Sequence, residues 1–248
     1  MWNAIMIIDT DSHTHPFQGS RDYDGMRKYA EAAVARGLKR IVFTEHTPVA
    51  PCFDHNNRHH LNFEEYETYL ECAERCRAEF AGRLEIGIGI EADYHPRNLE
   101  QVAEFKRGYP LEYVGGSLHL HAAFWKDETA GLSGDAYFVY ALDRTLELVE
   151  SGLFSTLNHL DFFRWKHDDY DPRRYEDRFR NIFAAMVKND VALELNTSGI
   201  RKSFASFLPC PKVWQWSLEY PLRRVYGSDA HQPEFIASDL AAAQKLFP

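Results

Sequence analysis

Hydrophobic and polar residues follow two different periods along the chain, and the period changes at regular intervals. Short apolar, β-branched segments predict strands, whereas longer segments with apolar residues three or four positions apart predict helices. Strands are expected at residues 4–10, 40–44, 84–90, 111–118, 154–157, 191–195 and 222–226. Helices are expected at residues 23–36, 63–80, 98–107, 135–151, 173–188, 211–219 and 233–246.

This alternation of strands and helices is typical of an α/β protein with a parallel sheet. Seven such units within 248 residues favour a closed or nearly closed barrel, with an open doubly wound sheet as the alternative. The chain has no internal repeat and no segment with the composition of a linker. We therefore expect a single domain over residues 1–248.

Composition and charge narrow the choice of partners and compartment. The net charge of -9 argues against non-specific binding to nucleic acid, which depends on neutralising phosphates. No apolar stretch approaches the roughly 20 residues of a membrane span, and the first residues lack the basic segment of a secretory signal. The 4 cysteines are scattered, so we expect a reduced, cytoplasmic protein. The oligomeric state stays open.

Polar residues with metal-binding or catalytic side chains directly follow the predicted strands. The segments are Asp11-Ser12-His13-Thr14-His15, Thr44-Glu45-His46, Glu91-Ala92-Asp93, His119-Leu120-His121, Asn158-His159, Asn196-Thr197-Ser198 and Ser228-Asp229-Ala230-His231. In a barrel enzyme the carboxyl ends of the strands form the active-site face. Because histidines placed at random would fall on helices equally often, this placement predicts a functional site.

The residue types in these segments suit a metal centre with more than one ion. Imidazole and carboxylate groups without thiolates favour zinc, iron or manganese. The candidate ligands are His13, His15, His46, Glu91, His119, His159, Asp229 and His231. One ion with an open position needs about three or four protein ligands, so this set implies two or three divalent ions. Glu91 is the natural carboxylate to bridge two of them.

The remaining histidines and aromatic groups have simpler interpretations. The loop histidines His55, His59, His60 and His167 are expected to be solvated, with a role in a lid as the alternative. His95 precedes a proline, which favours a turn. His121 stays open between a metal ligand, a substrate contact and neither. Residues 162–165, Trp214 and Trp216 are expected to pack in the interior.

Taken in order, these segments resemble the polymerase-and-histidinol-phosphatase (PHP) superfamily. The resemblance rests on Asp11-Ser12-His13-Thr14-His15, Phe43-Thr44-Glu45-His46-Thr47-Pro48, Gly89-Ile90-Glu91-Ala92-Asp93-Tyr94, Ser117-Leu118-His119, Asn196-Thr197-Ser198-Gly199-Ile200-Arg201-Lys202 and Gly227-Ser228-Asp229-Ala230-His231. The most similar group is the monofunctional histidinol phosphate phosphatases. The resemblance implies a distorted (β/α)7 barrel with a trinuclear metal site at the carboxyl ends of its strands.

The resemblance also implies which residues hold each ion. The first ion would bind His13, His15, Glu91 and Asp229, and the second would bind Glu91, His119 and His159. The third ion would bind His46, His231 and one further histidine from the loop after the first motif.

That further histidine is missing here, because the loop is short and Gln18 takes the corresponding place. An amide oxygen is a poor ligand for zinc. The sequence therefore leaves open whether the third ion is weak, absent, or completed by water or Asp22.

The implied reaction is hydrolysis of a small phosphorylated metabolite, L-histidinol phosphate, to L-histidinol and phosphate, as a step of histidine biosynthesis. Glu91, Asp229 and His231 are the expected catalytic residues, and a hydroxide held between two ions is the expected nucleophile. Arg201 and Lys202 are expected to contact the phosphate. Asp229, His231 or a metal-bound water would protonate the leaving alcohol.

Further groups around the metal ligands have expected supporting roles. Asp11, Glu45 and Asp93 are expected to orient the imidazoles of metal ligands. The amino alcohol of the substrate needs polar or acidic contacts, for which the candidates are Asp93, Asp161, Phe124 and Trp125.

Three alternatives stay open at the level of sequence. The chain could be a PHP phosphoesterase for another small phosphate ester, such as a nucleotide. An amidohydrolase-type C–N hydrolase also uses a His-x-His pair in a barrel, but no lysine stands at a strand end here. A non-catalytic PHP module is compatible with the missing histidine, although the other ligand candidates are present.

Overall fold

Seven parallel strands form one sheet in which each strand pairs with the next along the chain. The computed structural model describes residues 9–49, 60–165, 167 and 169–246. The strands are β1 (Thr10–Thr14), β2 (Arg40–His46), β3 (Glu85–Asp93), β4 (Tyr113–Ser117), β5 (Thr156–Leu157), β6 (Ala192–Asn196) and β7 (Arg224–Gly227). This order is the one expected from repeated strand–helix units.

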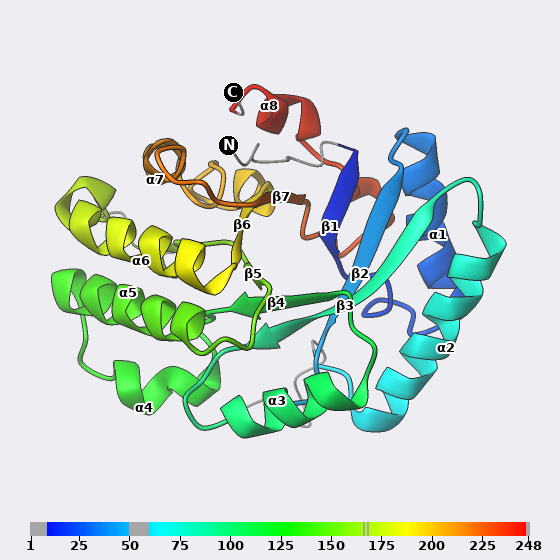
Figure 1. Ribbon diagram of the computed structural model, residues 1–248, viewed down its shortest axis with the longest axis horizontal. Coiled ribbons are helices and arrows are strands. Elements are labelled where there is room, and N and C mark those ends of the chain that lie inside the picture. Colours follow the sequence, from blue (N-terminus) through cyan, green and yellow to red (C-terminus); the bar gives the residue numbers. More distant parts are fainter. Residues whose placement is uncertain (1–8, 50–59, 166, 168, 247–248) are drawn as a thin grey trace.

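Helices surround the strands on the outside of the sheet (Figure 1). They are α1 (Tyr23–Ala35), α2 (Phe63–Glu79), α3 (Leu99–Gly108), α4 (Lys126–Thr129), α5 (Gly134–Glu150), α6 (Glu176–Asn189), α7 (Pro211–Ser217) and α8 (Leu240–Gln244). Short 3-10 turns lie at Ala123–Trp125, Phe162–Arg164, Pro172–Tyr175, Ser198–Arg201 and Pro233–Phe235. Within the described ranges, no helix is both long enough and apolar enough to cross a membrane.

The two ends of the sheet meet, which closes the barrel. The backbone N–H of Asp229 donates to the carbonyl of His13 at 2.8 Å, and the N–H of His15 donates to the carbonyl of Ala230 at 2.8 Å. The segment after β7 therefore continues the pairing onto β1, and a bridge joins Thr14 to Ala230. The expectation of a closed or nearly closed barrel is confirmed, and this closure brings the first and last sequence motifs together.

Strand β3 shows how the sequence aims polar side chains into the barrel. Successive side chains on a strand point to opposite faces, so Ile86, Ile88 and Ile90 share one face and pack in the hydrophobic core. Glu91 and Asp93 lie on the other face, at the carboxyl end of the strand. The alternation therefore gives each residue type its own side of the sheet.

The first expected strand differs in its position. Residues 4–8 lie outside the described residues, and β1 runs from Thr10 to Thr14. His13 therefore lies within the strand instead of after it. The cause is pairing on both sides, with β2 along Thr10 and Asp11 and with the segment after β7 at the end of the strand.

The other expected elements between residues 23 and 227 agree with the structure within a few residues. The expected helix at 233–246 is wrong. The backbone turns at Ala237 and Asp239, which both have positive φ, and only Leu240–Gln244 is α-helical. Two contacts hold this turn, because Ala237 N–H donates to Asp11 and the Tyr226 hydroxyl donates to the carbonyl of Ser238. These long-range hydrogen bonds outweigh local helix propensity.

Candidate metal centre

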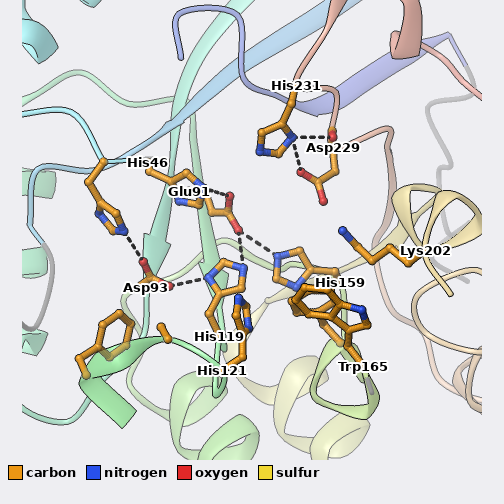
Figure 2. Close-up of a pocket in the computed structure, with 14 residues that line it drawn as sticks. His46, Glu91, Asp93, His119, His121, His159, Trp165, Lys202, Asp229 and His231 are labelled. Atoms are coloured by element: carbon orange, nitrogen blue, oxygen red, sulfur yellow. Dashed lines mark hydrogen bonds and ion pairs between the residues drawn. The ribbon is translucent and has the colours of Figure 1, made fainter. Parts of the chain in front are cut away.

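A cavity of about 280 Å³ opens at the carboxyl ends of the strands (Figure 2). Six of the eight predicted metal ligands line it: His46, Glu91, His119, His159, Asp229 and His231. The other two, His13 and His15, are fully buried beside Glu91. The predicted ligands therefore converge on one site, as expected from their places at the ends of neighbouring strands.

Glu91 lies between two groups of histidines. Its Oε2 is 3.2 Å from His13 Nε2 and 3.2 Å from His15 Nε2. Its Oε1 is 2.9 Å from His159 Nε2 and 3.6 Å from His119 Nε2. Each carboxylate oxygen thus faces a separate group of ring nitrogens, which is the geometry of a carboxylate that bridges two cations.

The first group has the electronic character of a cation site. His13 Nδ1 is 2.8 Å from the Glu194 carboxylate, which only accepts hydrogen bonds, so Nδ1 carries a proton and Nε2 is the nitrogen that would bind a metal ion. His15 Nε2 lies 3.1 Å from His13 Nε2 and 3.4 Å from Asp229 Oδ1. Neighbouring carboxylates raise the pKa of His13 and His15 despite their burial, so this buried group calls for positive charge, supplied by ring protons or by a metal ion. The residues present therefore fit a divalent metal.

The second group consists of Glu91, His119 and His159, whose ligand atoms lie within 4.8 Å of one another. Nδ1 of His119 is 2.6 Å from Asp93 Oδ1, so a carboxylate orients this ring from behind. Such carboxylate–histidine pairs are typical of metal ligands, because they fix the tautomer and raise the basicity of the ring. The expected orienting role of Asp93 fits this contact.

The region expected for a third ion is less complete. His15, His46 and His231 have ligand atoms within 4.8 Å of one another, but His15 also belongs to the first group. Asp22 does not complete this region, because its carboxylate caps α1 by accepting a hydrogen bond from Gly25 N–H at 2.8 Å. Gln18 is partly exposed, and its backbone N–H donates to Glu45.

The two central carboxylates stay ionised in this surrounding. Burial alone would raise the pKa of Glu91, but the neighbouring His46 and His13 hold that pKa well below its usual range. The same balance applies to Asp229, where burial is outweighed by His13 and by a hydrogen bond from His15, so its pKa also lies well below the usual range. Both groups are therefore anionic at neutral pH and able to bind a cation.

Glu194 is a site residue that the sequence reasoning missed. Its carboxylate contacts His13 Nδ1 through Oε1, and its Oε2 accepts hydrogen bonds from His159 N–H at 2.6 Å and Asn196 Nδ2 at 3.1 Å. It thereby connects a ligand of the first group to a ligand of the second. The available signal was a charged residue in the middle of an otherwise apolar strand, β6.

The other expected orienting residues have different roles. Glu45 Oε2 is 3.8 Å from His15 Nδ1, while its Oε1 accepts a hydrogen bond from Phe17 N–H at 2.5 Å. Asp11 accepts hydrogen bonds from Ser228 N–H and Ala237 N–H, both at 2.9 Å. Asp11 therefore joins the first strand to the segments after β7, and the expectation that it orients an imidazole is not supported.

The two residues expected to contact phosphate point in different directions. Lys202 lines the cavity, with Nζ 5.0 Å from the centre of the Phe162 ring (Figure 2). The Arg201 guanidinium instead donates to Ser238 Oγ at 2.6 Å and to the carbonyl of Ser228 at 2.8 Å. The phosphate role expected for Arg201 therefore lacks structural support, because its donors are engaged in holding the chain after β7.

Two of the expected loop and turn histidines differ from their interpretation. The expectation that His60 is solvated is wrong. Its ring stacks on His46 with centroids 5.2 Å apart, and it lines the cavity. His167 is half-buried and stacks on Tyr137 at 4.5 Å. His95 accepts a hydrogen bond from Arg97 N–H at Nδ1, as expected for a turn. His55 and His59 lie outside the described residues.

One wall of the cavity consists of aromatic side chains. Phe124, Phe162 and Trp165 line it, so two of the residues expected to pack also face the cavity, whereas Phe163 packs in the core as expected. His121 lines it too and lies edge-on to the rings of Phe162 and Trp165.

Two other residues that were expected to contact the amino alcohol of the substrate lie outside the cavity. Asp161 is buried and accepts hydrogen bonds from Cys210 N–H and from the Arg164 side chain. Trp125 is fully buried against His95. Neither residue lines the cavity.

Comparison with known proteins agrees with this architecture. A family model described as PHP domain matches residues 11–198. A protein from Deinococcus radiodurans named "Probable histidinol-phosphatase" is 33% identical over 95% of this chain and 91% of its own length. The "Histidinol-phosphatase" of Bacillus subtilis is 25% identical over 96% of this chain and 97% of its own length.

A solved structure supports the same fold. The histidinol phosphate phosphatase of Lactococcus lactis, whose crystal structure is a complex with zinc, L-histidinol and phosphate, superposes with a TM-score of 0.77. It shares 22% sequence identity, and the match covers 98% of this chain and 93% of that one. The resemblance deduced from the sequence motifs is confirmed by the family match, and the chain belongs to the PHP domain family.

Proposed function

We propose that the protein is a metal-dependent phosphomonoesterase that hydrolyses L-histidinol phosphate to L-histidinol and phosphate. The observation that carries the proposal is the position of Glu91, whose two oxygens face separate groups of ring nitrogens beside a cavity. Two cations held in this way form a clamp suited to phosphoryl transfer. The relatives named histidinol-phosphatase, which match nearly the whole chain, support the choice of substrate.

The distances between the side chains support two ligand sets. His13, His15, Glu91 and Asp229 would hold the first ion, and Glu91, His119 and His159 would hold the second. Zinc, iron and manganese all suit nitrogen and carboxylate ligands. When bound, such ions neutralise charge on the phosphoryl group and activate water for attack.

The side chains around these ligands supply charge and protons. Lys202 offers an ammonium group to phosphoryl oxygens at the cavity wall. Asp229 is held in place by Ser198, whose hydroxyl donates to Oδ2 at 2.9 Å. The exposed His231 ring lines the cavity, and its Nδ1 donates a hydrogen bond to the carbonyl of Asp229 at 3.1 Å, so Nε2 is the nitrogen that would take part in proton transfer.

The cavity wall matches the chemistry of the alcohol. The flat faces of Phe124, Phe162 and Trp165 suit an imidazole ring, which prefers stacked or edge-on contacts with aromatic rings. Together with the names of the relatives, this wall favours L-histidinol phosphate over a nucleotide, which carries a bulkier sugar and base.

The experiment is a substrate panel with protein of known metal content. Phosphate release is measured from L-histidinol phosphate, phosphoethanolamine, O-phosphoserine and nucleoside monophosphates. The proposal predicts that kcat/KM is highest for L-histidinol phosphate. Preference for a nucleotide would replace the substrate assignment and keep the reaction class. No release from any ester by metal-loaded protein would contradict the phosphatase function and favour a non-catalytic role.

A further inference from the structure

A further group of ligand side chains adjoins the two already described. His46, His60 and Asp93 each offer a ligand atom, and these atoms lie within 4.8 Å of one another. His46 ends β2 and Asp93 ends β3, while His60 comes from the segment that leads into α2. All three side chains line the cavity. No motif of the sequence analysis included His60 in a metal site.

The orientation of His60 suits a metal ligand. Nδ1 of the ring lies 3.1 Å from the carbonyl oxygen of Thr47, which only accepts hydrogen bonds, so the ring proton is on Nδ1. Nε2 then faces Asp93 Oδ2, 3.1 Å away. Two acceptors at this distance need a proton or a metal ion between them. A carbonyl behind a ligating imidazole is a common feature of metal sites.

The two carboxylate oxygens of Asp93 face different histidines, and one of them faces His60. Its Oδ1 is 2.6 Å from Nδ1 of His119, a ligand of the second group. Its Oδ2 faces His60. The buried carboxylate therefore orients a ligand of the second ion with one oxygen and can bind another cation with the other.

The alternative position for a third ion has fewer side chains of its own. In the group of His15, His46 and His231, the Nε2 of His15 already lies close to His13, Glu91 and Asp229. One lone pair cannot serve two ions. The group of His46, His60 and Asp93 supplies three side chains that neither of the first two ions uses as ligands, against two in the group of His15, His46 and His231.

We propose that a third divalent cation binds between His46, His60 and Asp93, in place of the position completed by a loop histidine elsewhere in the family. Two nitrogens and one carboxylate suit zinc and leave a coordination position open to the cavity. The inference rests on the proposed function for the presence of the first two ions. Its test reads metal position and metal content, independently of activity.

The first experiment locates the metals directly. The full chain is stripped of metal, loaded with zinc and crystallised, and anomalous scattering is measured at the zinc edge. The proposal predicts a third peak between the side chains of His46, His60 and Asp93. A third peak between His15, His46 and His231 would overturn it, and so would peaks at only the first two positions.

The second experiment counts zinc per chain in His60→Ala and in a control, His167→Ala. His167 is also half-buried and stacked on an aromatic ring, but it lies outside the cavity. His60→Ala should lose one zinc equivalent after dialysis, and the control should lose none. Unchanged zinc content in His60→Ala would overturn the inference. The anomalous map of the unchanged protein gives the answer even if the variant does not fold.

The two proposals fail in different ways. Wild-type protein that binds three zinc ions but does not hydrolyse L-histidinol phosphate would contradict the proposed function alone. Wild-type protein that hydrolyses this substrate with two ions and no peak at His60 would contradict the third site alone.

Discussion

At the scale of single residues, the centre depends on carboxylates that act on the ligand histidines from behind. Glu194 contacts the ring of His13 and the backbone N–H of His159. Asp93 does the same for the ring of His119. Because these contacts fix which ring nitrogen carries the proton, they decide which nitrogen is available to a metal.

Replacing Glu194 by glutamine should weaken zinc binding by roughly 10- to 100-fold, the usual cost of losing a partner behind a metal ligand. The carboxylate accepts hydrogen bonds with both oxygens, whereas an amide has one acceptor and would turn an N–H toward a donor. Zinc affinity is measured by competition with a chelator. Glu150→Gln, at the exposed end of α5, is the control. Equal affinities in the two variants would contradict this role.

Lys202→Ala should lower kcat/KM for the phosphate ester by about 10- to 100-fold, since a charge-assisted hydrogen bond contributes about 1.5–3 kcal/mol. Inhibition by inorganic phosphate should weaken in parallel. Lys188→Ala, on the exposed face of α6, should change neither quantity. If both lysine variants behave alike, Lys202 does not contact the phosphate.

The residue scale also shows where sequence reasoning ends. The i and i+2 spacing of His13 and His15 is visible in the sequence, because strand geometry relates neighbours of this kind. Arg201 and Lys202 are adjacent, and only the turn at Ser198–Arg201 decides which one faces the cavity. His60 reaches the cavity from the segment before α2, and no local pattern in the sequence predicts a contact between segments so far apart.

At the scale of elements, the strands place the site and their glycines make room for it. A Cβ added to Gly227 in β7 would overlap the carboxylate of Glu194 and lie 2.8 Å from Cβ of His13. The absence of a side chain on β7 thus allows the carboxylate from β6 to reach a histidine on β1. The closed barrel explains this contact, since β7 neighbours both β6 and β1.

Gly227→Ala should lower the free energy of unfolding by about 1–3 kcal/mol, the usual cost of overpacking, and should also weaken zinc binding. Urea denaturation measures the first effect. Gly108→Ala, at the end of α3, is the control because its added Cβ meets open space. It should raise stability by roughly 0.5–1 kcal/mol. A Gly227→Ala protein as stable as the wild type would contradict the crowding argument.

Element boundaries were predictable where local pattern decides them and were not where tertiary contacts do. Helix α2 begins with a capping box of Asn62 and Glu65, a signal that is local in sequence. The turn that breaks the expected final helix depends on Asp11 and Tyr226, which are distant in sequence. The sequence therefore predicts the barrel and its order of strands better than the path of the last segment.

At the scale of the whole molecule, the metal ligands come from both ends of the chain, so metal binding and folding are coupled. His13 lies on the first strand and Asp229 follows the last. Anything that binds only the folded state stabilises it, by about 2.7 kcal/mol per site at one hundred times the Kd. Metals should therefore stabilise the closed barrel as well as act in catalysis.

Chelation should lower the melting temperature by roughly 10–20 °C for the loss of two such ions in a chain of this size. Adding zinc back should restore it. Calorimetry with and without chelator measures the shift, and a Glu91→Gln variant should melt at nearly the same temperature in both conditions. If the melting temperature of the wild type is the same with and without chelator, no tightly bound metal stabilises the fold.

The central claim is that Glu91 joins two metal ions into one hydrolytic site. The most direct test measures zinc per chain and phosphate release from L-histidinol phosphate on the same samples of wild type and Glu91→Gln. We predict at least two zinc ions and rapid release in the wild type, and fewer ions with release reduced at least a thousandfold in the variant, about 4 kcal/mol. Full activity in Glu91→Gln, or in metal-free wild type, would contradict the claim.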